Sequence, residues 1–385
     1  MSRGNPDFDM TSQTFTIRSL QAFCYRYPLS TPVVTSFGRM LNRPAVFVCV
    51  EDEDGTTGWG EVWSNFPSNG AEHRARLVNE VLAPAVAGAA ASKPAQIFEK
   101  LTLGTAVLAL QSGEQGPFAQ AIAGIDIAVW DLYARRSGKA LWKLFGGNRS
   151  RINVYASGIN PIGSRQMAEA ALARGYRALK LKVGFELAAD RANLASLRDL
   201  VGKGMLAADV NQGWSIDQAL ELAPSLAEFD LAWLEEPIRA DRPWQDWQTL
   251  RKRTGVPPLA AGENIASRGG FDQALSGDVL RVVQPDIAKW GGLTECSAIA
   301  RHIVKSGKTF CPHYLGGGIG LLASAHLLAG VGGDGLLEVD ANENPLRDRF
   351  CGPVVDVREG AISLSDDPGL GIEPELASIE KYRTA

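Results

Sequence analysis

The stretch RALKLKVGF, residues 177–185, places two lysines inside an apolar run that is otherwise typical of a buried strand. Side chains alternate along a strand, so Lys180 and Lys182 project to one face and the apolar residues around them to the other. On a half-exposed strand the lysine face would lie in water, which is the simplest interpretation of an isolated pair. The alternative is that both lysines face a polar cavity, and the rest of the chain favours it.

Residues 151–340 repeat a short apolar strand followed by a helix. The repetition predicts eight strands: INVYAS, RALKLKV, MLAADVN, LAWLEEP, PLAAGEN, LRVVQPDIA, TFCPHY and LLEVDAN. Strand–helix–strand repeats produce right-handed crossovers and a parallel sheet. An open sheet of this kind usually has about five or six strands and a glycine-rich phosphate-binding turn, and no such turn follows INVYAS. The pattern therefore favours an α/β fold in which the sheet closes into a (β/α) barrel.

Residues 14–140 show a different pattern from the repeats that follow. FTIRSLQAFCYRYPL alternates like a strand, and AVFVCVEDEDGTTGWGEV indicates two strands joined by a turn. Helical periodicity then covers AEHRARLVNEVLAPAVAG, PAQIFEKLTL and the long run that begins at Gln120. We expect an α+β capping domain over residues 14–140, completed by residues 361–385, and a barrel domain over residues 150–360.

The composition narrows the class of partner. Charged residues make up 21% of the chain and the net charge is −4, which provides no basic surface for nucleic acid or an anionic membrane. The five cysteines are scattered and lack a CxxC pair, which argues against a disulfide framework and a zinc site. Neither a membrane-spanning apolar run nor a signal peptide is recognisable. We therefore expect a cytoplasmic protein that binds a small molecule.

A polar side chain stands at the carboxyl end of nearly every predicted barrel strand. In a barrel these strand ends line the active site. A carboxylate after a strand is often the N-cap of the next helix, but seven consecutive strands that end this way favour a central polar site. The residues are Lys180, Lys182, Asp209, Asn211, Glu235, Glu263, Asp286, His313 and Glu338.

Asp209, Glu235 and Glu263 follow consecutive strands, so the barrel would bring three carboxylates together. Packing them without a counter-ion would cost roughly several kcal/mol and force protonation. Oxygen ligands without cysteine or histidine favour one Mg²⁺ ion. Asn211 lies on the same strand face as Asp209 and could bind substrate or a water on the metal. Strand parity directs Glu236 away from Glu235, so we assign the metal to Glu235 alone.

Asp286 and His313 end neighbouring strands across the barrel from the lysines. A carboxylate beside an imidazole orients the ring, fixes its tautomer and raises its pKa. A lone histidine is more often structural, but this pairing inside a polar cavity predicts an acid–base catalyst. On the other wall, we expect repulsion between Lys180 and Lys182 to lower their pKa values, so that Lys182 could act as a base near neutral pH.

On these motifs the sequence resembles the mandelate racemase group of the enolase superfamily. GWGE and GIDIAVWDL are typical of the family's capping domain, and the resemblance runs from about residue 14 to the C-terminus. It implies a modified TIM barrel of the (β/α)₇β type beneath an α+β cap. The matching barrel motifs are KLK at Lys180 and Lys182, DVN at Asp209, EEP at Glu235, GEN at Glu263, QPD at Asp286, PH at His313 and LLEVD at Glu338.

The resemblance also implies a role for each residue of the predicted site. The three carboxylates would bind one Mg²⁺ ion, and Lys182 and the His313–Asp286 pair would transfer protons on opposite faces of the substrate. Glu338 would hydrogen-bond the substrate carboxylate, and Lys180 would help to stabilise an ene-diolate intermediate.

Asp286 occupies the position of a catalytic lysine in the muconate-lactonizing and dipeptide-epimerase groups, and Lys289 does not replace that lysine. Their two-lysine arrangement is therefore excluded. We expect abstraction of a proton α to a carboxylate, most simply in an acid-sugar dehydratase, with lactone cycloisomerase and racemase or epimerase as alternatives. A homologue that binds metal and ligand without catalysis is the alternative of a different class, although it would have no use for two opposed bases.

The expected partner is a small carboxylate substrate, namely a polyhydroxy acid or its lactone. Lys180, Asn211 and Glu338 would bind it from the barrel. We expect neither nucleic acid nor a membrane as a partner, and we expect the chain to form a homo-oligomer. Two cap loops provide the predicted specificity contacts, which are Ser36, Arg39, Arg43, Trp63 and Asn65.

Overall fold

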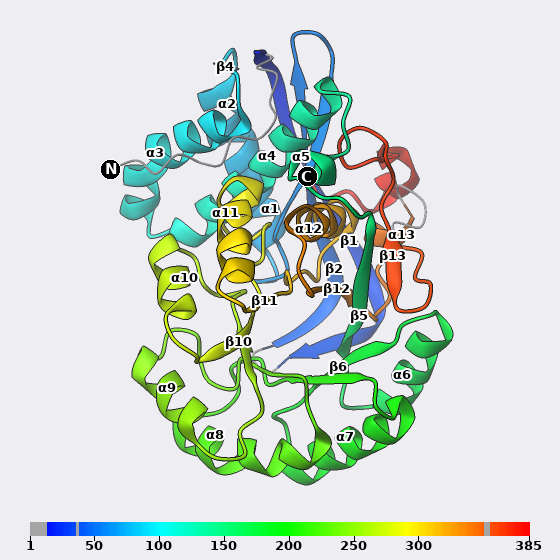
Figure 1. The fold of residues 1–385 in the computed structure, drawn as a ribbon. Coiled ribbons are helices and arrows are strands. Elements are labelled where there is room, and N and C mark those ends of the chain that lie inside the picture. The colour runs from blue at the N-terminus through cyan, green and yellow to red at the C-terminus, as the bar shows by residue number, and fades with distance from the viewer. Residues whose placement is uncertain (1–13, 36–37, 350–354) are drawn as a thin grey trace.

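A parallel sheet of eight strands, joined in sequence order, forms the barrel (Figure 1). The computed structural model describes residues 14–35, 38–349 and 355–385. In the described chain β12 pairs with β5, which leaves a single seam between β11 and β12. β13 (Ala361–Ser363) pairs antiparallel with β5. The eight strands are β5 (Arg151–Ile159), β6 (Ala178–Lys182), β7 (Met205–Asp209), β8 (Leu234–Glu235), β9 (Leu259–Ala261), β10 (Leu280–Val283), β11 (Thr309–Phe310) and β12 (Leu336–Asp340).

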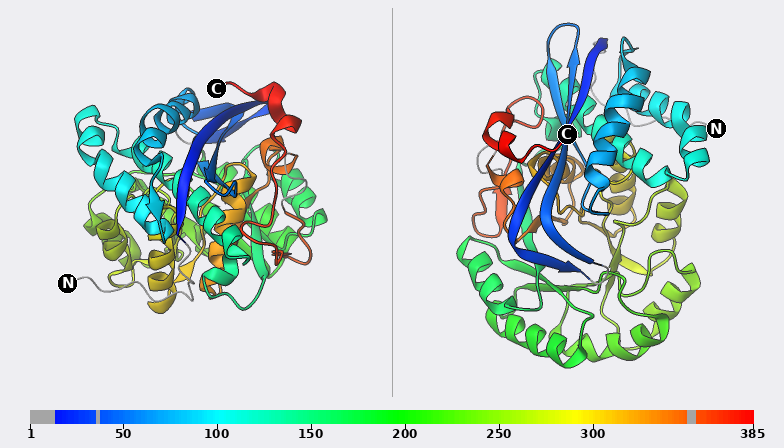
Figure 2. Two further views of the ribbon diagram at one scale, coloured as in Figure 1. Left: turned by 90° about the horizontal axis from the view of Figure 1, so that it is seen from above. Right: turned by 180° about the vertical axis from the view of Figure 1, so that it is seen from behind.

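Helices separate successive strands and form the outer ring of the barrel, as the two views of Figure 2 show. The sheet therefore consists of strand–helix units closed by a final strand, and the predicted (β/α)₇β barrel is confirmed. Within the described ranges, every helix is too short or too polar to cross a lipid bilayer. The helices of the ring are α6 (Ser164–Ala173), α7 (Leu187–Val201), α8 (Ile216–Leu222), α9 (Trp244–Lys252), α10 (Arg268–Leu275), α11 (Gly292–Lys305) and α12 (Gly318–Val331).

The inside of the barrel is layered along β6. Ala178 belongs to an apolar layer that also contains Tyr155 and Trp233, whose rings meet edge to face at 5.4 Å. Lys180 lies one layer nearer the mouth, with Nζ 5.6 Å from the centre of the Tyr155 ring. Lys182 follows in the next layer, and the two lysines are only 1% and 5% exposed. The KLK motif therefore faces the polar interior of the barrel and not water.

The second sheet is antiparallel, with strand order β3–β2–β1–β4, and confirms the α+β cap. The last residues of the chain return to it, because Thr384 N donates to Cys24 O and Cys24 N donates to Ala385 O, both at 2.8 Å. The elements of this region are β1 (Phe15–Thr35), β2 (Gly38–Asp52), β3 (Thr57–Val62), β4 (Ala90–Ala91), α1 (Gly70–Arg76), α2 (Ala83–Val86), α3 (Pro94–Ser112), α4 (Gln115–Arg136) and α5 (Leu141–Leu144).

The glycines of the GWGE motif let α4 lie directly on β3. A Cβ atom on Gly60 would stand 2.0 Å from Gly124 O, and one on Gly58 would stand 2.3 Å from Ala128 O. No side chain can occupy either position, so helix and strand pack backbone to backbone. This close packing helps to bury most of α4 and makes it the central helix of the cap.

Two buried cap carboxylates hold the barrel helices α11 and α12 by their first turns. Asp126 accepts hydrogen bonds from Thr294 N at 2.9 Å and from the Thr294 hydroxyl at 2.6 Å. Glu61 accepts from Gly317 N at 2.6 Å and from Gly320 N at 2.9 Å. Both carboxyl groups satisfy free N–H groups at the start of these helices. The cap is thereby fixed at the edge of the barrel where the strands end.

Candidate active site

Lys180 lies at the centre of a buried charge cluster formed by β6, β8 and β12. Its Nζ is 2.6 Å from Glu235 Oε1 and 2.7 Å from Glu338 Oε1. Burial disfavours the ammonium most strongly, but the carboxylates of Glu235 and Glu338 outweigh burial and hold the pKa of Lys180 well above its usual value. Lys180 is therefore a fixed cation that balances two buried carboxylates.

Lys182 lies one layer nearer the mouth, in contact with the DVN motif. Its Nζ donates to Asp209 Oδ2 at 2.8 Å and to Asn211 Oδ1 at 2.6 Å. The expectation that repulsion lowers the lysine pKa values is wrong. Burial is the largest effect and Lys180 adds to it, but Asp209 and its hydrogen bond overcome both and raise the pKa of Lys182. The sequence shows that Lys180 is close enough to repel Lys182, but it does not give the distance from Lys182 to the attracting carboxylate of Asp209.

The three carboxylates of the predicted metal site come from adjacent parts of the sheet. Asp209 and Glu235 are register partners on β7 and β8, and Glu263 follows β9. Glu235 also accepts from Gln284 Nε2 at 2.7 Å, and burial raises its pKa to about 7. Their oxygens engage Lys182, Lys180 and the imidazole of His313, respectively, and among the described residues no three carboxylate, thiolate or imidazole groups converge on one point.

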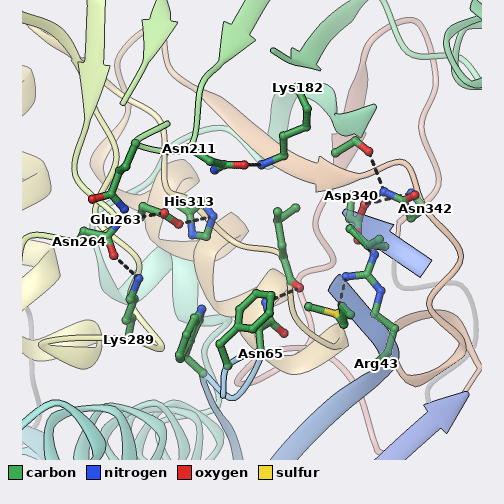
Figure 3. Close-up of a pocket in the computed structure, with 17 residues that line it drawn as sticks. Arg43, Asn65, Lys182, Asn211, Glu263, Asn264, Lys289, His313, Asp340 and Asn342 are labelled. Carbon is green, nitrogen blue, oxygen red and sulfur yellow. Dashed lines mark hydrogen bonds and ion pairs between the residues drawn. The ribbon is translucent and has the colours of Figure 1, made fainter. Parts of the chain in front are cut away.

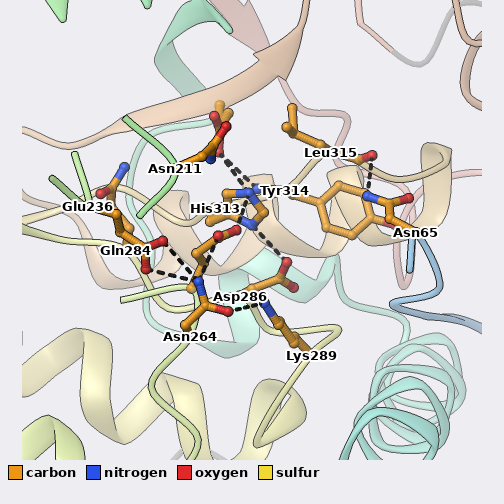
Figure 4. A network of polar contacts seen from close by, with 12 residues as sticks. Asn65, Asn211, Glu236, Asn264, Gln284, Asp286, Lys289, His313, Tyr314 and Leu315 are labelled. Atoms are coloured by element: carbon orange, nitrogen blue, oxygen red, sulfur yellow. Dashed lines mark hydrogen bonds and ion pairs between the residues drawn. The ribbon is translucent and has the colours of Figure 1, made fainter. Parts of the chain in front are cut away.

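Glu236 is a buried carboxylate that strand parity directs away from the predicted metal site. Glu236 and Glu235 do have different partners. Parity alone does not give the direction of the Glu236 side chain, however, because β8 ends at Glu235 and the φ of Glu236 is 38°. Asn264 Nδ2 donates to both oxygens of Glu236, at 3.0 and 2.9 Å (Figure 4), and to Glu263 Oε1 at 2.9 Å. Burial and then repulsion from Glu263 raise the pKa of Glu236 well above its usual value. Glu236 therefore adds a fourth carboxylate at the edge of this cluster.

His313 lies between two carboxylates. Its Nδ1 is 2.8 Å from Asp286 Oδ2 (Figure 4), and its Nε2 is 2.7 Å from Glu263 Oε2. Burial disfavours the protonated ring, but Glu263 and Glu338 outweigh burial and hold the pKa of His313 well above its usual value. Asp286 is oriented in turn by Ala288 N, which donates to its Oδ1 at 2.9 Å. The pair is therefore rigid, with one ring nitrogen directed at the carboxylate cluster.

A cavity of about 230 Å³ lies between the cap and the mouth of the barrel (Figure 3). Its volume suits a small ligand and not a macromolecule. Arg39 is exposed and lies outside the lining, and Ser36 falls outside the described residues. Of the residues selected from the sequence, those that line the cavity are Lys182, Asn211, Glu263 and His313 from the barrel and Arg43, Trp63 and Asn65 from the cap.

Lys289 and Asn264 also line the cavity, although neither was selected from the sequence. Lys289 Nζ donates to Asn264 Oδ1 at 2.6 Å and lies 4.7 Å from the centre of the Trp63 ring. Asn264 could have been found, because it follows Glu263 directly in the GEN motif. Lys289 stands in a loop, where no periodicity indicates the direction of its side chain.

Arg43 and Asp340 form a buried ion pair across the boundary between cap and barrel. Arg43 on β2 donates through Nη2 to Asp340 Oδ2 at the end of β12, and the two residues are 2% and 3% exposed. Asp340 was missed, although it stands two residues after Glu338 and so projects to the same face. The ion pair forms part of the cavity wall.

Comparison with known proteins identifies the family of both halves of the chain. The profile described as mandelate racemase / muconate lactonizing enzyme, N-terminal domain, matches residues 17–146, and the enolase C-terminal domain-like profile matches residues 164–378. D-galactarolactone cycloisomerase of Agrobacterium fabrum is 29% identical and aligns with 95% of this chain and 98% of its own length. The 3,6-anhydro-alpha-L-galactonate cycloisomerase of Streptomyces coelicolor is 31% identical and aligns with 92% of this chain and 96% of its own length.

Solved structures agree with these sequence matches. A mandelate racemase/muconate lactonizing enzyme from Bordetella bronchiseptica RB50 superposes with a TM-score of 0.90 at 51% identity, covering 96% of this chain and 100% of its own. A racemase from Streptomyces coelicolor A3(2) with bound magnesium superposes with a TM-score of 0.86 at 28% identity, covering 96% and 100%. The matches span cap and barrel alike, and the chain therefore belongs to the mandelate racemase/muconate lactonizing enzyme family of the enolase superfamily.

Proposed function

We propose that this enzyme removes the proton α to the carboxylate of a polyhydroxy acid and then expels an oxygen leaving group from the β-carbon, as an acid-sugar dehydratase does. The observation that carries the proposal is the presence of two proton-transfer groups, Lys182 and His313, on the wall of one small cavity. Two relatives support the substrate class, because their names describe enzymes of a sugar-acid lactone and an anhydro sugar acid.

We propose Asp209, Glu235 and Glu263 as the residues that hold one Mg²⁺ ion. Carboxylate oxygens without sulfur or nitrogen are the donor set that this hard cation prefers. Each of the three carboxylates engages the nitrogen of a different basic side chain, so these contacts would have to rearrange for the three to share one ion. Bound there, Mg²⁺ would supply Lewis-acid stabilisation of negative charge on the substrate carboxylate. The magnesium in the racemase of Streptomyces coelicolor supports the assignment.

The residues of the chain itself would orient the substrate and move its protons. A C–H bond next to a carboxylate is far too weak an acid for lysine or histidine unaided, so electrostatic stabilisation of the ene-diolate must supply most of the rate enhancement. Lys180 contributes a fixed positive charge to that stabilisation, and Glu338, carrying a proton when the substrate is bound, would donate a hydrogen bond to the substrate carboxylate. The configuration at the α-carbon decides whether Lys182 or His313 removes the proton.

Dehydration then balances as a β-elimination. The α C–H bond and the β C–O bond break, the electrons of the C–H bond form a C=C bond, and the leaving hydroxide takes the electrons of the C–O bond. His313, oriented by Asp286, would donate the proton that converts hydroxide into water. The enol product tautomerises to a 2-keto acid.

Ring opening is the second candidate reaction, because two of the relatives are cycloisomerases by name. It would use the same abstraction of the α-proton. The leaving oxygen would be a ring oxygen that stays attached to the product, so the product would be an isomer of the substrate and no water would be lost.

A screen of acid sugars and their lactones with Mg²⁺ in D₂O tests the proposal. Formation of a 2-keto acid from an open-chain acid indicates dehydration, an isomer of a lactone indicates ring opening, and deuterium at an intact α-carbon indicates racemisation. If no compound exchanges its α-proton, the proposal is wrong and a non-catalytic role is favoured. His313→Asn should abolish dehydration, and any α-deuteration that survives would identify Lys182 as the base.

A further inference from the structure

The buried Arg43–Asp340 pair has no part in the proton transfers proposed above. Figure 3 shows His313 and Glu263 toward one end of the cavity and Arg43 and Asp340, with Asn342, toward the other. A substrate whose α-carbon lies beside His313 would therefore extend its remaining carbons toward the ion pair. The pair is therefore placed to contact the end of the substrate that lies farthest from the α-carbon.

The negative charge of Asp340 is held rigidly in the wall of the cavity. Its Oδ1 accepts from Asn342 N at 3.0 Å and from Asn342 Nδ2 at 2.8 Å, and the same amide donates to Gly158 O at 2.8 Å. Gly158 has a φ of 69°, and a Cβ atom there would stand 2.7 Å from Asp340 Oδ1. The neighbouring strand thus requires glycine so that the carboxylate can occupy its position.

Two nitrogens of Arg43, Nη1 and Nε, donate to no oxygen among the residues that the structure describes. Its Nη2 binds Asp340, but the neighbour of its Nη1 is the sulfur of Met40 at 3.6 Å, a weak acceptor, and its Nε is buried without a hydrogen-bond partner. Buried donors without partners are costly, and native structures rarely keep them without a reason. Nε itself is shielded from the cavity, but Arg43 lines it, so an oxygen of the ligand would replace the weak Met40 sulfur as the acceptor of Nη1.

We propose that the Arg43–Asp340 pair recognises an uncharged hydroxyl at the far end of the substrate, so that the enzyme prefers monocarboxylic acid sugars to sugar diacids. The inference rests on the proposed function. A hydroxyl can accept from Arg43 and donate to Asp340 at once. A second carboxylate has no proton to donate, and it would be repelled by Asp340, which already neutralises Arg43.

Lys182 and Lys289 are the other cations that line the cavity among the described residues, and neither offsets this repulsion. The Nζ of Lys182 is held by Asp209 Oδ2 at 2.8 Å. Lys289 is engaged as well. Its Nζ is held by Asn264 Oδ1 at 2.6 Å and over the Trp63 ring. Figure 3 shows it at the Glu263 end of the cavity, away from Asp340. A terminal carboxylate directed at the Arg43–Asp340 pair would therefore meet a fixed negative charge, and the described part of the wall offers no free cation beside it.

The experiment compares acids that differ only at the terminal carbon, with Mg²⁺ present. Galactonate is paired with galactarate, and gluconate with glucarate, and kcat/KM is measured for each acid. The parent should prefer the monoacid by about tenfold or more in each productive pair. Asp340→Asn keeps the shape of the side chain and removes its charge, so the diacid-to-monoacid ratio should rise by about tenfold or more. Asp356→Asn is the matched control, since that aspartate is 65% exposed, and it should keep the parent ratio.

A parent that prefers the diacid in its productive pairs would overturn the inference. So would an unchanged ratio in an Asp340→Asn variant that keeps the circular dichroism and melting temperature of the parent. If the variant does not fold, the preference of the parent still decides. Failure of the proposed function gives a distinct result, because then neither acid of any pair would exchange its α-proton in D₂O and no ratio would exist.

Discussion

Nδ1 of His313 lies 2.8 Å from Oδ2 of Asp286, so the carboxylate determines which ring nitrogen is left for chemistry. Asp286→Asn should lower kcat by roughly 100-fold or more, because an amide cannot balance the charge of a protonated ring. Steady-state kinetics on the best substrate of the acid-sugar screen measure the effect. Asp272→Asn is the matched control, since that aspartate lies 4.0 Å from the exposed His302 and should be dispensable. Parent activity in Asp286→Asn would contradict the acid–base assignment.

Lys180→Met should destabilise the fold, because it leaves Glu235 and Glu338 buried without their cation. Breaking a buried ion pair on one side costs roughly 3–5 kcal/mol. The free energy of unfolding in urea at neutral pH, measured without Mg²⁺, tests this expectation. Lys203→Met, at an exposed position, should change the stability by less than about 0.5 kcal/mol. Equal stability of the two variants would mean that Lys180 does not balance these carboxylates.

Glu235→Gln should abolish tight binding of Mg²⁺. The substitution keeps the size of the side chain and removes one of the negative charges that attract the ion. Isothermal titration with MgCl₂ measures the affinity directly, without a substrate. Glu186→Gln, at the exposed N-cap of α7, should bind Mg²⁺ as the parent does. The metal assignment is wrong if both variants bind the ion equally well.

Glu61 should make the attachment of the cap depend on pH. Burial raises the pKa of its carboxyl group to about 7 from an ordinary 4.5, so the folded protein holds a proton that the unfolded chain releases. Its contribution to stability is therefore full below pH 4.5 and is lost as the pH rises through 7, by an amount on the order of 3 kcal/mol. Urea unfolding of the parent and of Glu61→Gln at pH 5 and pH 8 isolates this contribution.

The difference in unfolding free energy between the parent and Glu61→Gln should become less favourable to the parent at pH 8. Groups other than Glu61 titrate in both proteins and cancel in this difference. Asp278→Asn, at a side chain that is 91% exposed, should show the same difference from the parent at both pH values. The expectation is wrong if the difference in unfolding free energy between the parent and Glu61→Gln is also the same at pH 5 and pH 8.

The sequence was sufficient for the barrel because its signals are periodic. Alternation within strands and their repetition along the chain predict which side chains project inward, and the buried Lys180 and Lys182 agree with that prediction. The same parity would have revealed Asp340, two residues after Glu338. It could not locate Glu236, because alternation ends where the strand does and the backbone there has a φ of 38°.

The pKa values of the lysines illustrate a second limit of sequence reasoning. The repulsion between Lys180 and Lys182 is visible in the KLK motif, but the carboxylates that overcome it come from strands far along the chain. Their effect depends on distances such as the 2.8 Å between Lys182 Nζ and Asp209 Oδ2, which only the folded barrel defines. Lys289 was missed for a related reason, since a loop residue has no periodic neighbour to indicate its direction.

Glu61 and Asp126 attach the cap to the barrel mainly by accepting hydrogen bonds from main-chain N–H groups of α12 and α11. Every helix offers such amides at its first turn whatever its side chains are, so substitutions over most of the barrel surface leave the joint intact. The sequence is constrained only close to the contact, for example at Gly317, where a Cβ atom would stand 2.6 Å from Glu61 Oε1. A joint of this kind makes the cap an exchangeable module. Recombination between family members could bring new specificity loops to a barrel whose proton-transfer residues stay unchanged.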